Sequence, residues 1–486
     1  MNPIEELSPK GVWRNFYALT QIPRPSGHTE KVANFLVDFA KKNGAEAYID
    51  DAGNVIMKKG ATAGYEDRET TVLQAHMDMV PQKNNNIQFD FQKDPIRAYI
   101  DGEWVTADGT TLGADNGIGV ATAMTILADD TIAHPALEAF FTVDEETGMY
   151  GAFDLQGGVL QGKTLLNLDS EQEGELYVGC AGGVDAEITF DYIAQPVPAG
   201  DVALAVTIEG LKGGHSGCDI NLQRANANKL LFRFLKEAVS EYDARLSSVN
   251  GGSLRNSIPR EATAVVTVPA DGVEDLKSLV DDYEDLFIRE YDGVEDDIHF
   301  TVADTKALSV VPEEIQDALI HSVIACPDGV QRVIPEMPDV VETSNNLAII
   351  STEQVNGEEQ RIKVICLSRS SVESRKEELQ EKIESCFALA GAKVEFSGSY
   401  PGWKPNLNSH ILDLMKETYK ELFGKDARII IIHAGLECGI IGRNYPGMDM
   451  ISFGPTIKHP HSPDEKVNIQ TVEQFYQLLL ATLKKL

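Results

Sequence analysis

Short apolar runs that end in acids or a histidine recur through the first third of this chain. The runs are Thr71 to Ala75, followed by His76; Phe140 to Val143, followed by Asp144, Glu145 and Glu146; and Thr164 to Leu168, followed by Asp169. Apolar runs of about four to eight residues are typical of buried strands. Helix-compatible segments lie between them, which predicts an α/β fold: a mainly parallel sheet flanked by helices, with a site along one edge.

The pattern changes near residue 180. Beyond it, alternating strands such as Val202 to Ile208 are separated by amphipathic helices such as Ala227 to Val239. This texture predicts an inserted α+β domain. We therefore expect a catalytic domain made of residues 1–185 and 398–486, and a lid domain of residues 186–397. Two similar sets of elements within the lid suggest that it has two similar halves.

Composition narrows the class of protein. The chain has 486 residues, a formal net charge of -34 and no basic tract, which disfavours nucleic acid and anionic membranes as partners. It contains no apolar run of about eighteen residues, and its first residues carry acids rather than a signal-peptide core. Six scattered cysteines without a Cys-x-x-Cys motif do not form a disulfide framework. We predict a cytoplasmic protein.

The acids after Val143 require explanation because adjacent carboxylates repel each other and are costly to bury unpaired. A divalent metal would neutralise them, with one glutamate bound and its neighbour left free as a base. For an isolated acid pair, a solvated turn after a strand is the favoured interpretation.

His76 and Asp78 lie two apart on a predicted strand, so their side chains point the same way. The histidine could bind a metal while the aspartate fixes its orientation. A structural histidine held by a neighbouring acid is the alternative. Asp115 lies in the glycine-rich segment Gly113 to Gly119 and could be a helix N-cap. Alternatively, it could approach a ligand closely at a site where only small neighbouring residues fit.

Together, the strand and loop ends supply two imidazoles and three carboxylates. These candidate ligands are His76, Asp115, Glu146, Asp169 and His461. If Asp115 bridges two ions, each ion also receives one histidine and one further carboxylate. Nitrogen and oxygen ligands without thiolate suit catalytic zinc, and cobalt or manganese could substitute.

Five motifs make the chain resemble the zinc aminoacylase and glutamate-carboxypeptidase-like metallopeptidases. The motifs are His76 to Asp78, Gly113 to Gly117, Asp144 to Gly148, Asn167 to Glu171 and His461 to Glu465. The resemblance runs essentially end to end and is strongest to the dipeptidase branch. It implies a di-zinc aminopeptidase-like catalytic domain with an inserted lid. It also implies hydrolysis of dipeptides with free amino termini, Xaa-His included, and a role in peptide catabolism.

The resemblance implies a role for each candidate. One metal would be held by His76, Asp115 and Asp169, and the other by Asp115, Glu146 and His461. Glu145 would be the general base that deprotonates a metal-bridged water and later protonates the leaving amine. Asp78 would orient His76.

The remaining candidates lie in the predicted lid or close to its return to the catalytic domain. By the same resemblance, His215 would stabilise the oxyanion, Arg369 would hold the substrate carboxylate, and Asn256 would also contact the substrate. His433 and Glu437 are expected near the site, either against the substrate or in support of other residues.

Two other functions stay open: a deacylase or amidohydrolase of N-acyl amino acids on the same scaffold, and a non-catalytic binding protein. A small peptide is the expected partner, and a homodimer is compatible with the sequence. Simpler relatives borrow the lid histidine from a dimer partner, whereas a doubled lid could supply His215 from the same chain.

Overall fold

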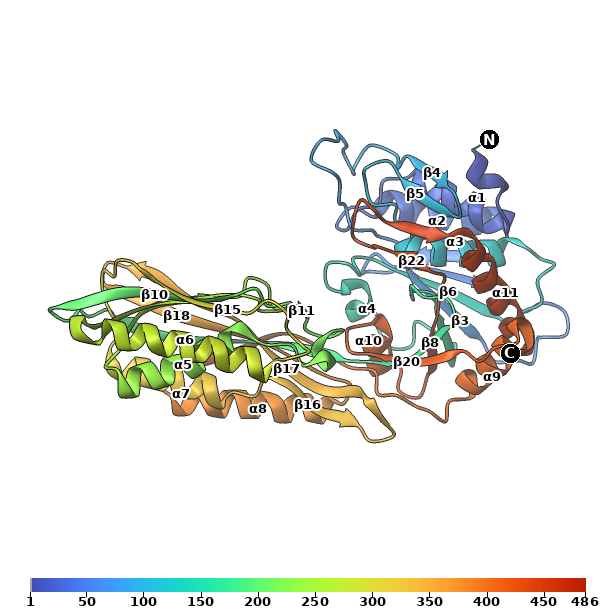
Figure 1. The fold of residues 1–486 in the computed structure, drawn as a ribbon. Helices are drawn as coiled ribbons and strands as arrows, with labels where there is room; N and C mark the ends of the chain where they lie inside the picture. The colour runs from blue at the N-terminus through green and yellow to red at the C-terminus, as the bar shows by residue number, and fades with distance from the viewer. Residues whose placement is uncertain (1) are drawn as a thin grey trace. The chain divides into compact units, whose positions relative to one another are not determined.

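The computed structural model describes residues 2–486 and divides into two compact units (Figure 1). Unit 1 comprises the chain up to Gly179 together with Trp403–Ile431 and Leu436–Leu486. Unit 2 comprises Cys180–Gly402 and Ile432–Gly435. The expected boundaries after residues 185 and 397 thus lie after residues 179 and 402, and the segment Ile432–Gly435 also belongs to unit 2. This segment contacts the start of unit 2, where the Ala181 N–H donates to the carbonyls of Ile432 and Ala434.

The main sheet of unit 1 has eight strands. In spatial order they are β1 (Glu46–Ile49), β2 (Val55–Lys59), β6 (Leu137–Thr142), β3 (Thr71–His76), β7 (Thr164–Asn167), β21 (Asp449–Ser452), β8 (Glu175–Cys180) and β20 (Arg428–Ile432). The four central strands β6, β3, β7 and β21 run parallel, whereas β1–β2, β2–β6 and β21–β8 are antiparallel pairs. The sheet is therefore mixed, and the expectation of a mainly parallel sheet holds only at its centre.

Helices and a small sheet complete unit 1. The helices are η1 (Pro3–Glu6), α1 (Lys10–Thr20), α2 (Glu30–Lys42), α3 (Ala114–Ala128), α4 (Tyr150–Asp154), α9 (His410–Phe423), α10 (Glu437–Asn444) and α11 (Ile469–Lys485). The small sheet joins β22 (Ile457–Lys458), β23 (Lys466–Asn468), β5 (Trp104–Ala107) and β4 (Ala98–Asp101). Helix α3 packs against α1, α2 and β3 and is buried from Ala114 to Leu127, which suits its small and apolar residues (Figure 1).

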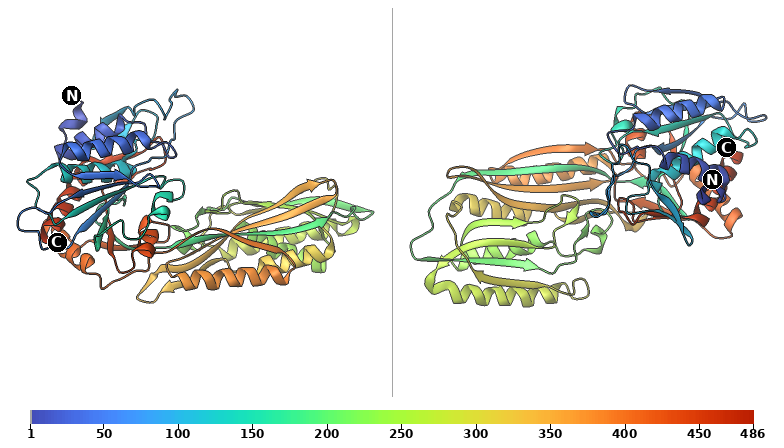
Figure 2. Two further views of the ribbon diagram at one scale, coloured as in Figure 1. Left: turned by 180° about the vertical axis from the view of Figure 1, so that it is seen from behind. Right: turned by 90° about the horizontal axis from the view of Figure 1, so that it is seen from above.

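Unit 2 is built on a nine-stranded sheet. Its main path is β15 (His299–Asp304), β10 (Asp201–Glu209), β14 (Ala262–Pro269), β12 (Arg245–Gly251), β17 (Met337–Asn356), β18 (Glu359–Ser370), β9 (Gly182–Ile193) and β19 (Lys393–Tyr400), with β16 (Gly329–Ile334) paired to β17. The other elements are α5 (Ala227–Glu241), α6 (Val273–Glu290), α7 (Glu313–Ala325), α8 (Glu373–Leu389), β11 (Gly214–His215), β13 (Ser257–Ile258), η2 (Ile220–Leu222) and η3 (Ala270–Gly272). The four α-helices lie on one face of the sheet (Figure 2).

The sheet of unit 2 consists of two topologically equivalent halves. In chain order, one half is β10, α5, β12, β14, α6 and β15, and the other is β9, α7, β17, β18, α8 and β19. In each half the first strand lies between the third and fourth, and the two second strands, β12 and β17, pair with each other. The first half is thus inserted into the second, between β9 and α7.

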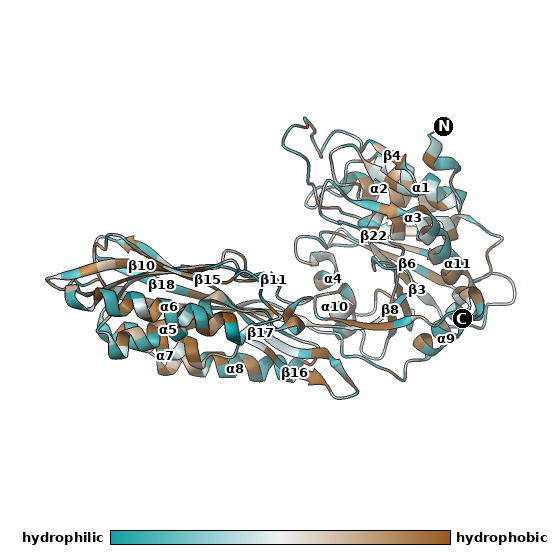
Figure 3. Ribbon diagram, viewed as in Figure 1, coloured by the Kyte–Doolittle hydropathy of each residue, from teal (hydrophilic) through white to brown (hydrophobic). Residues whose placement is uncertain are grey.

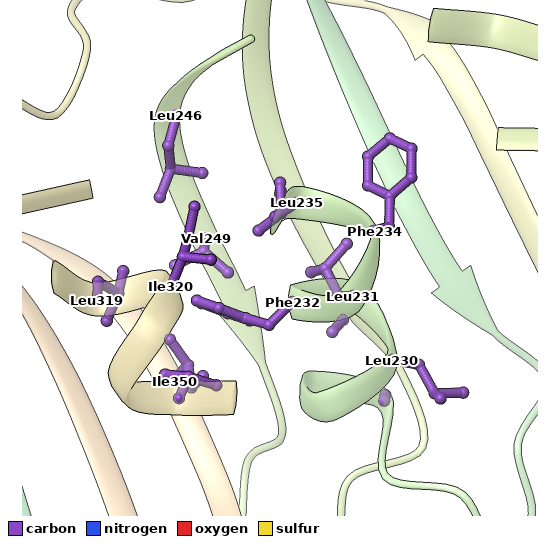
Figure 4. Packing of buried hydrophobic residues seen from close by; sticks show 14 of the residues in the cluster. Leu230, Leu231, Phe232, Phe234, Leu235, Leu246, Val249, Leu319, Ile320 and Ile350 are labelled. Atoms are coloured by element: carbon purple, nitrogen blue, oxygen red, sulfur yellow. The ribbon is translucent and has the colours of Figure 1, made fainter. Parts of the chain in front are cut away.

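Apolar helix faces cover this sheet. Polar and apolar residues alternate along α5 and α6 (Figure 3), and the buried residues of both halves belong to one continuous cluster. Phe232 of α5 points toward Val249 of β12 and toward Leu319 and Ile320 of α7 (Figure 4). Burying such a side chain stabilises the fold by about 1.5–3 kcal/mol, so the packing of these helices stabilises the sheet of unit 2.

Candidate active site

The central strands of unit 1 deliver the candidate ligands to one edge of the sheet. His76 is the last residue of β3 and pairs in register with Thr142, the last residue of β6. Glu145 and Glu146 follow β6, and Asp169 follows β7. Asp115 is in the first turn of α3, and His461 lies in the turn between β22 and β23. Residues from five distant segments therefore meet where the parallel strands end.

Asp115 lies between the two histidines. Its Oδ1 is 3.0 Å from His76 Nε2, and its Oδ2 is 3.2 Å from His461 Nε2. Each histidine also faces a second carboxylate: Asp169 Oδ1 is 3.4 Å from His76 Nε2, and Glu146 Oε2 is 2.9 Å from His461 Nε2. The side chains thus form two groups of three that share Asp115, the grouping expected if this carboxylate bridges two ions.

The electrostatics of this cluster suit divalent cations. Burial raises the pKa of Asp169 to about 6; His76 opposes the rise, and the Asp115 and Glu146 carboxylates add to it. Glu146 Oε1 and Asp169 Oδ1 are buried and accept no hydrogen bond among the described residues, although Asp169 Oδ1 lies at ion-pair distance from His76 Nε2. Ligand atoms of His76, Asp115 and Glu146 lie within 4.8 Å of one another. Cations placed here would relieve the repulsion and use the unpaired oxygens, so the residues fit a divalent metal.

Asp78 joins this cluster to the Glu145 loop. Its Oδ1 is 3.4 Å from His76 Nδ1, and it accepts hydrogen bonds from the backbone N–H groups of Glu145 and Glu146 and from Ser26 Oγ. Burial and the carboxylates of Asp169, Glu437 and Glu146 raise the pKa of Glu145 well above its usual range, against the opposing effect of His76. A carboxyl group with a raised pKa is suited to take up and release a proton near neutral pH.

Two buried residues that the sequence analysis did not single out fix the backbone of the cluster. The Glu465 carboxylate accepts hydrogen bonds from the N–H groups of four consecutive residues, Leu112, Gly113, Ala114 and Asp115. The Arg24 guanidinium donates to the carbonyls of Met77, Asp78 and Gly113. Glu465 belongs to a motif already recognised, which gave a weak signal, whereas nothing in the sequence around Arg24 indicated its place.

Glu437 lies beneath the strands that carry His76 and the acids. It is fully buried and accepts hydrogen bonds from Gln74 Nε2 of β3 (2.6 Å) and Thr142 Oγ1 of β6 (2.8 Å). Burial raises its pKa to about 8; His76 opposes the rise and Asp169 adds to it. Of the two roles left open for Glu437, this position favours support of the two strands over contact with substrate.

In unit 2, His215 has a defined tautomer. Its Nδ1 accepts the backbone N–H groups of Gly217 (3.1 Å) and Cys218 (3.0 Å), so in the neutral ring the proton is on Nε2. Burial and the nearby Arg369 cation lower its pKa. The imidazole is therefore a neutral hydrogen-bond donor. Asn256 lies next to it: its carbonyl accepts the Ser216 N–H, and its side chain is exposed.

Arg369 and His433 also lie in unit 2. Arg369 is only 5% exposed, and no carboxylate within residues 2–486 lies at ion-pair distance from its guanidinium. His433 Nε2 is 2.7 Å from Ser344 Oγ. Burial, together with the charge of Arg369, lowers the pKa of His433 to about 3, although the Val341 carbonyl opposes this. A buried cation beside neutral imidazoles is suited to an anionic ligand.

A family model described as peptidase family M20/M25/M40 matches residues 72–485. The chain belongs to this family. The M20 peptidase is 47% identical over 489 residues to the cytosol non-specific dipeptidase of Escherichia coli (strain K12), a match that covers 100% of this chain and 99% of that protein. Its structure is similar to that of aminoacylhistidine dipeptidase from Vibrio alginolyticus, with a TM-score of 0.93 and 48% identity over 100% and 98% of the two chains. Aminopeptidase PepT from Bacillus cereus ATCC 10987 shares the fold, with a TM-score of 0.57 and 16% identity over 99% of each chain.

These matches confirm the predicted family and its α/β fold with an inserted α+β lid. Among the helices of residues 2–486, none combines the length and apolar character that crossing a bilayer requires. The roles of the individual site residues remain predictions.

Proposed function

We propose that this M20 peptidase hydrolyses dipeptides with free amino termini, with a broad specificity that includes Xaa-His. The observation that carries the proposal is the Asp115 carboxylate between His76 and His461, each with a second acid beside it. The names of the Escherichia coli and Vibrio alginolyticus relatives support a dipeptide as the substrate.

The two groups that share Asp115 would hold two divalent ions, most suitably zinc, with cobalt or manganese as substitutes. Bound there, such ions polarise a peptide carbonyl and lower the pKa of a water molecule. The Asp78 carboxylate, fixed by Ser26 and two backbone N–H groups, would keep the His76 ring in orientation.

The protein's own groups would then carry the proton and the charge. Glu145 would take the proton from the attacking water and give it to the leaving amine. The Nε2–H of His215 would donate to the developing oxyanion, a role that its Nδ1 contacts prepare. Arg369 would bind the substrate carboxylate, with Asn256 and His433 as further substrate contacts. Because water attacks directly, no acyl-enzyme forms.

A substrate panel tests the proposal. Unblocked dipeptides and N-acylated amino acids are compared as substrates, each before and after treatment with a chelator. We expect dipeptides to be cleaved faster and the chelator to abolish cleavage. Preference for acylated amino acids would instead identify a deacylase, and full activity in the chelated protein would contradict the metal assignment.

We also propose a cytoplasmic location, which the name of the Escherichia coli relative supports. We further propose that the protein forms a homodimer, which analytical ultracentrifugation tests. A monomer with full dipeptidase activity would show that one chain is sufficient for catalysis.

A further inference from the structure

Four neighbouring strands of unit 2 place Ser344, Arg369, Gly183 and Tyr400 in one row. Arg369 of β18 pairs with Ser344 of β17 on one side and with Gly183 of β9 on the other, and Gly183 pairs in turn with Tyr400 of β19. Side chains at paired positions project from the same face of a sheet. Since Gly183 has no side chain, Arg369 and Tyr400 can meet above it, and Arg369 Nη1 donates to Tyr400 Oη over 2.8 Å.

The phenol is held tightly in this place. A Cβ atom at Gly183 would lie 2.6 Å from Cε1, Cζ and Oη of Tyr400, so the ring occupies the space that any other residue would fill. The backbone of Tyr400 is fixed as well, because Nζ of Lys376, a lysine only 1% exposed, donates to its carbonyl over 2.7 Å. The position of the phenol therefore determines how the guanidinium can turn.

The bond to Tyr400 leaves one edge of Arg369 available. Its Nε is buried and has no hydrogen-bond partner among the described residues. The N–H bonds of Nε and Nη2 are parallel and form an edge that binds a carboxylate through two hydrogen bonds at once. An orphaned, buried Nε–H is costly unless a ligand accepts from it.

We propose that Tyr400 is a positioning residue that turns the Nε–Nη2 edge of Arg369 toward the α-carboxylate of the substrate, and that it thereby sets the preference for peptides with a free carboxyl terminus. This inference rests on the proposed dipeptidase function and adds to it the residue that selects for the carboxylate.

Kinetics of Tyr400→Phe test the inference, because this change removes the hydroxyl and keeps the ring. We expect KM for dipeptides to rise about tenfold with kcat within about twofold, and KM for dipeptide C-terminal amides to stay unchanged. Gly183→Ala, which displaces the phenol, should act in the same direction. The control is Tyr192→Phe: Tyr192 of β9 donates to Gln360 of β18 over 2.9 Å, and loss of this hydroxyl should alter the KM of neither substrate class.

An equal rise in KM for acids and amides would show that Tyr400 only supports the fold and would overturn the inference, as would an unchanged KM for dipeptides. A second measurement does not depend on turnover. Binding of L-alanyl-L-histidine and of its C-terminal amide to the chelated full chain is followed by ligand-observed NMR. We expect Tyr400→Phe to weaken binding of the acid alone, whereas equal binding of acid and amide by the wild type contradicts the inference. Failure of the wild type to cleave any dipeptide would instead refute the proposed function.

Discussion

The two units of this peptidase gather opposite charges by different means. In unit 1, the acids and histidines lie at strand ends, in the loops that follow and at the start of α3, and the buried side chains Arg24 and Glu465 hydrogen-bond to the backbone of these segments. In unit 2, Arg369 and its neighbours lie on or beside a regular sheet, and their order follows from strand register. The acidic cluster of unit 1 is the proposed cation site, and Arg369 of unit 2 is the proposed binding group for an anion. The site in unit 1 therefore depends on buried side chains that hydrogen-bond to its backbone, whereas the position of Arg369 in unit 2 follows from the pairing of strands in the sheet.

A change at Glu145, the proposed general base, should have the largest effect on activity. We expect Glu145→Gln to lower kcat by about 10²–10⁴-fold, because the amide cannot accept a proton. Metal content should stay at the wild-type value, since Glu145 is not among the proposed ligands. Steady-state kinetics together with elemental analysis measure both. Near wild-type kcat in a variant that retains its metals would remove Glu145 from the mechanism.

The second largest effect is expected from Glu465, which hydrogen-bonds to the backbone around Asp115. Glu465→Gln places an NH₂ group against a row of four backbone donors, so the start of α3 and Asp115 should shift. We expect metal affinity to fall by about 10–100-fold, as for other residues that orient ligands. Calorimetric zinc titration of the apo-protein gives the affinity. Glu473→Gln, at a carboxylate that accepts from Ser8 at the surface, is the control and should bind zinc as the wild type does.

Within unit 2, Arg369→Lys keeps the charge but loses the edge that binds a carboxylate through two hydrogen bonds. We expect KM for dipeptides to rise about tenfold or more, with a smaller effect on kcat and no change in zinc affinity. This result would show that Arg369 contributes to substrate binding and not to metal binding. A loss of zinc affinity in this variant would mean that the two sites are not independent.

The smallest expected effect is on stability at acid pH. In the folded protein the pKa of His433 is lowered to about 3, against about 6.5 in an unfolded chain. Between these values the unfolded chain binds the extra proton, so this contribution to stability is present above about pH 6.5 and is lost as the pH falls toward 3. We expect His433→Gln to lose less Tm than the wild type between pH 7 and pH 4, by a few degrees, in scanning calorimetry. Parallel curves would show that His433 is not buried as a neutral group.

The sequence predicted the strand ends of unit 1 well because apolar runs and the polar residues that follow them are local features. His76, Asp115, Glu146, Asp169 and His461 were proposed as one group, and the fold brings them together. Arg24 and Glu465 could not be predicted in the same way, since both act on backbone atoms of remote segments. Likewise, the meeting of Arg369 and Tyr400 depends on the pairing of three strands, and the mixed direction of the unit 1 sheet depends on how its edge strands return.

The central claim is that the two oxygens of Asp115 serve two different divalent ions. Anomalous diffraction from crystals of the zinc-loaded protein tests it most directly. We predict two zinc peaks roughly 3.5–4 Å apart, each about 2.0–2.2 Å from a different oxygen of Asp115, with His76 beside one and His461 beside the other. A single peak, or two peaks that leave Asp115 without a zinc contact, would contradict the account.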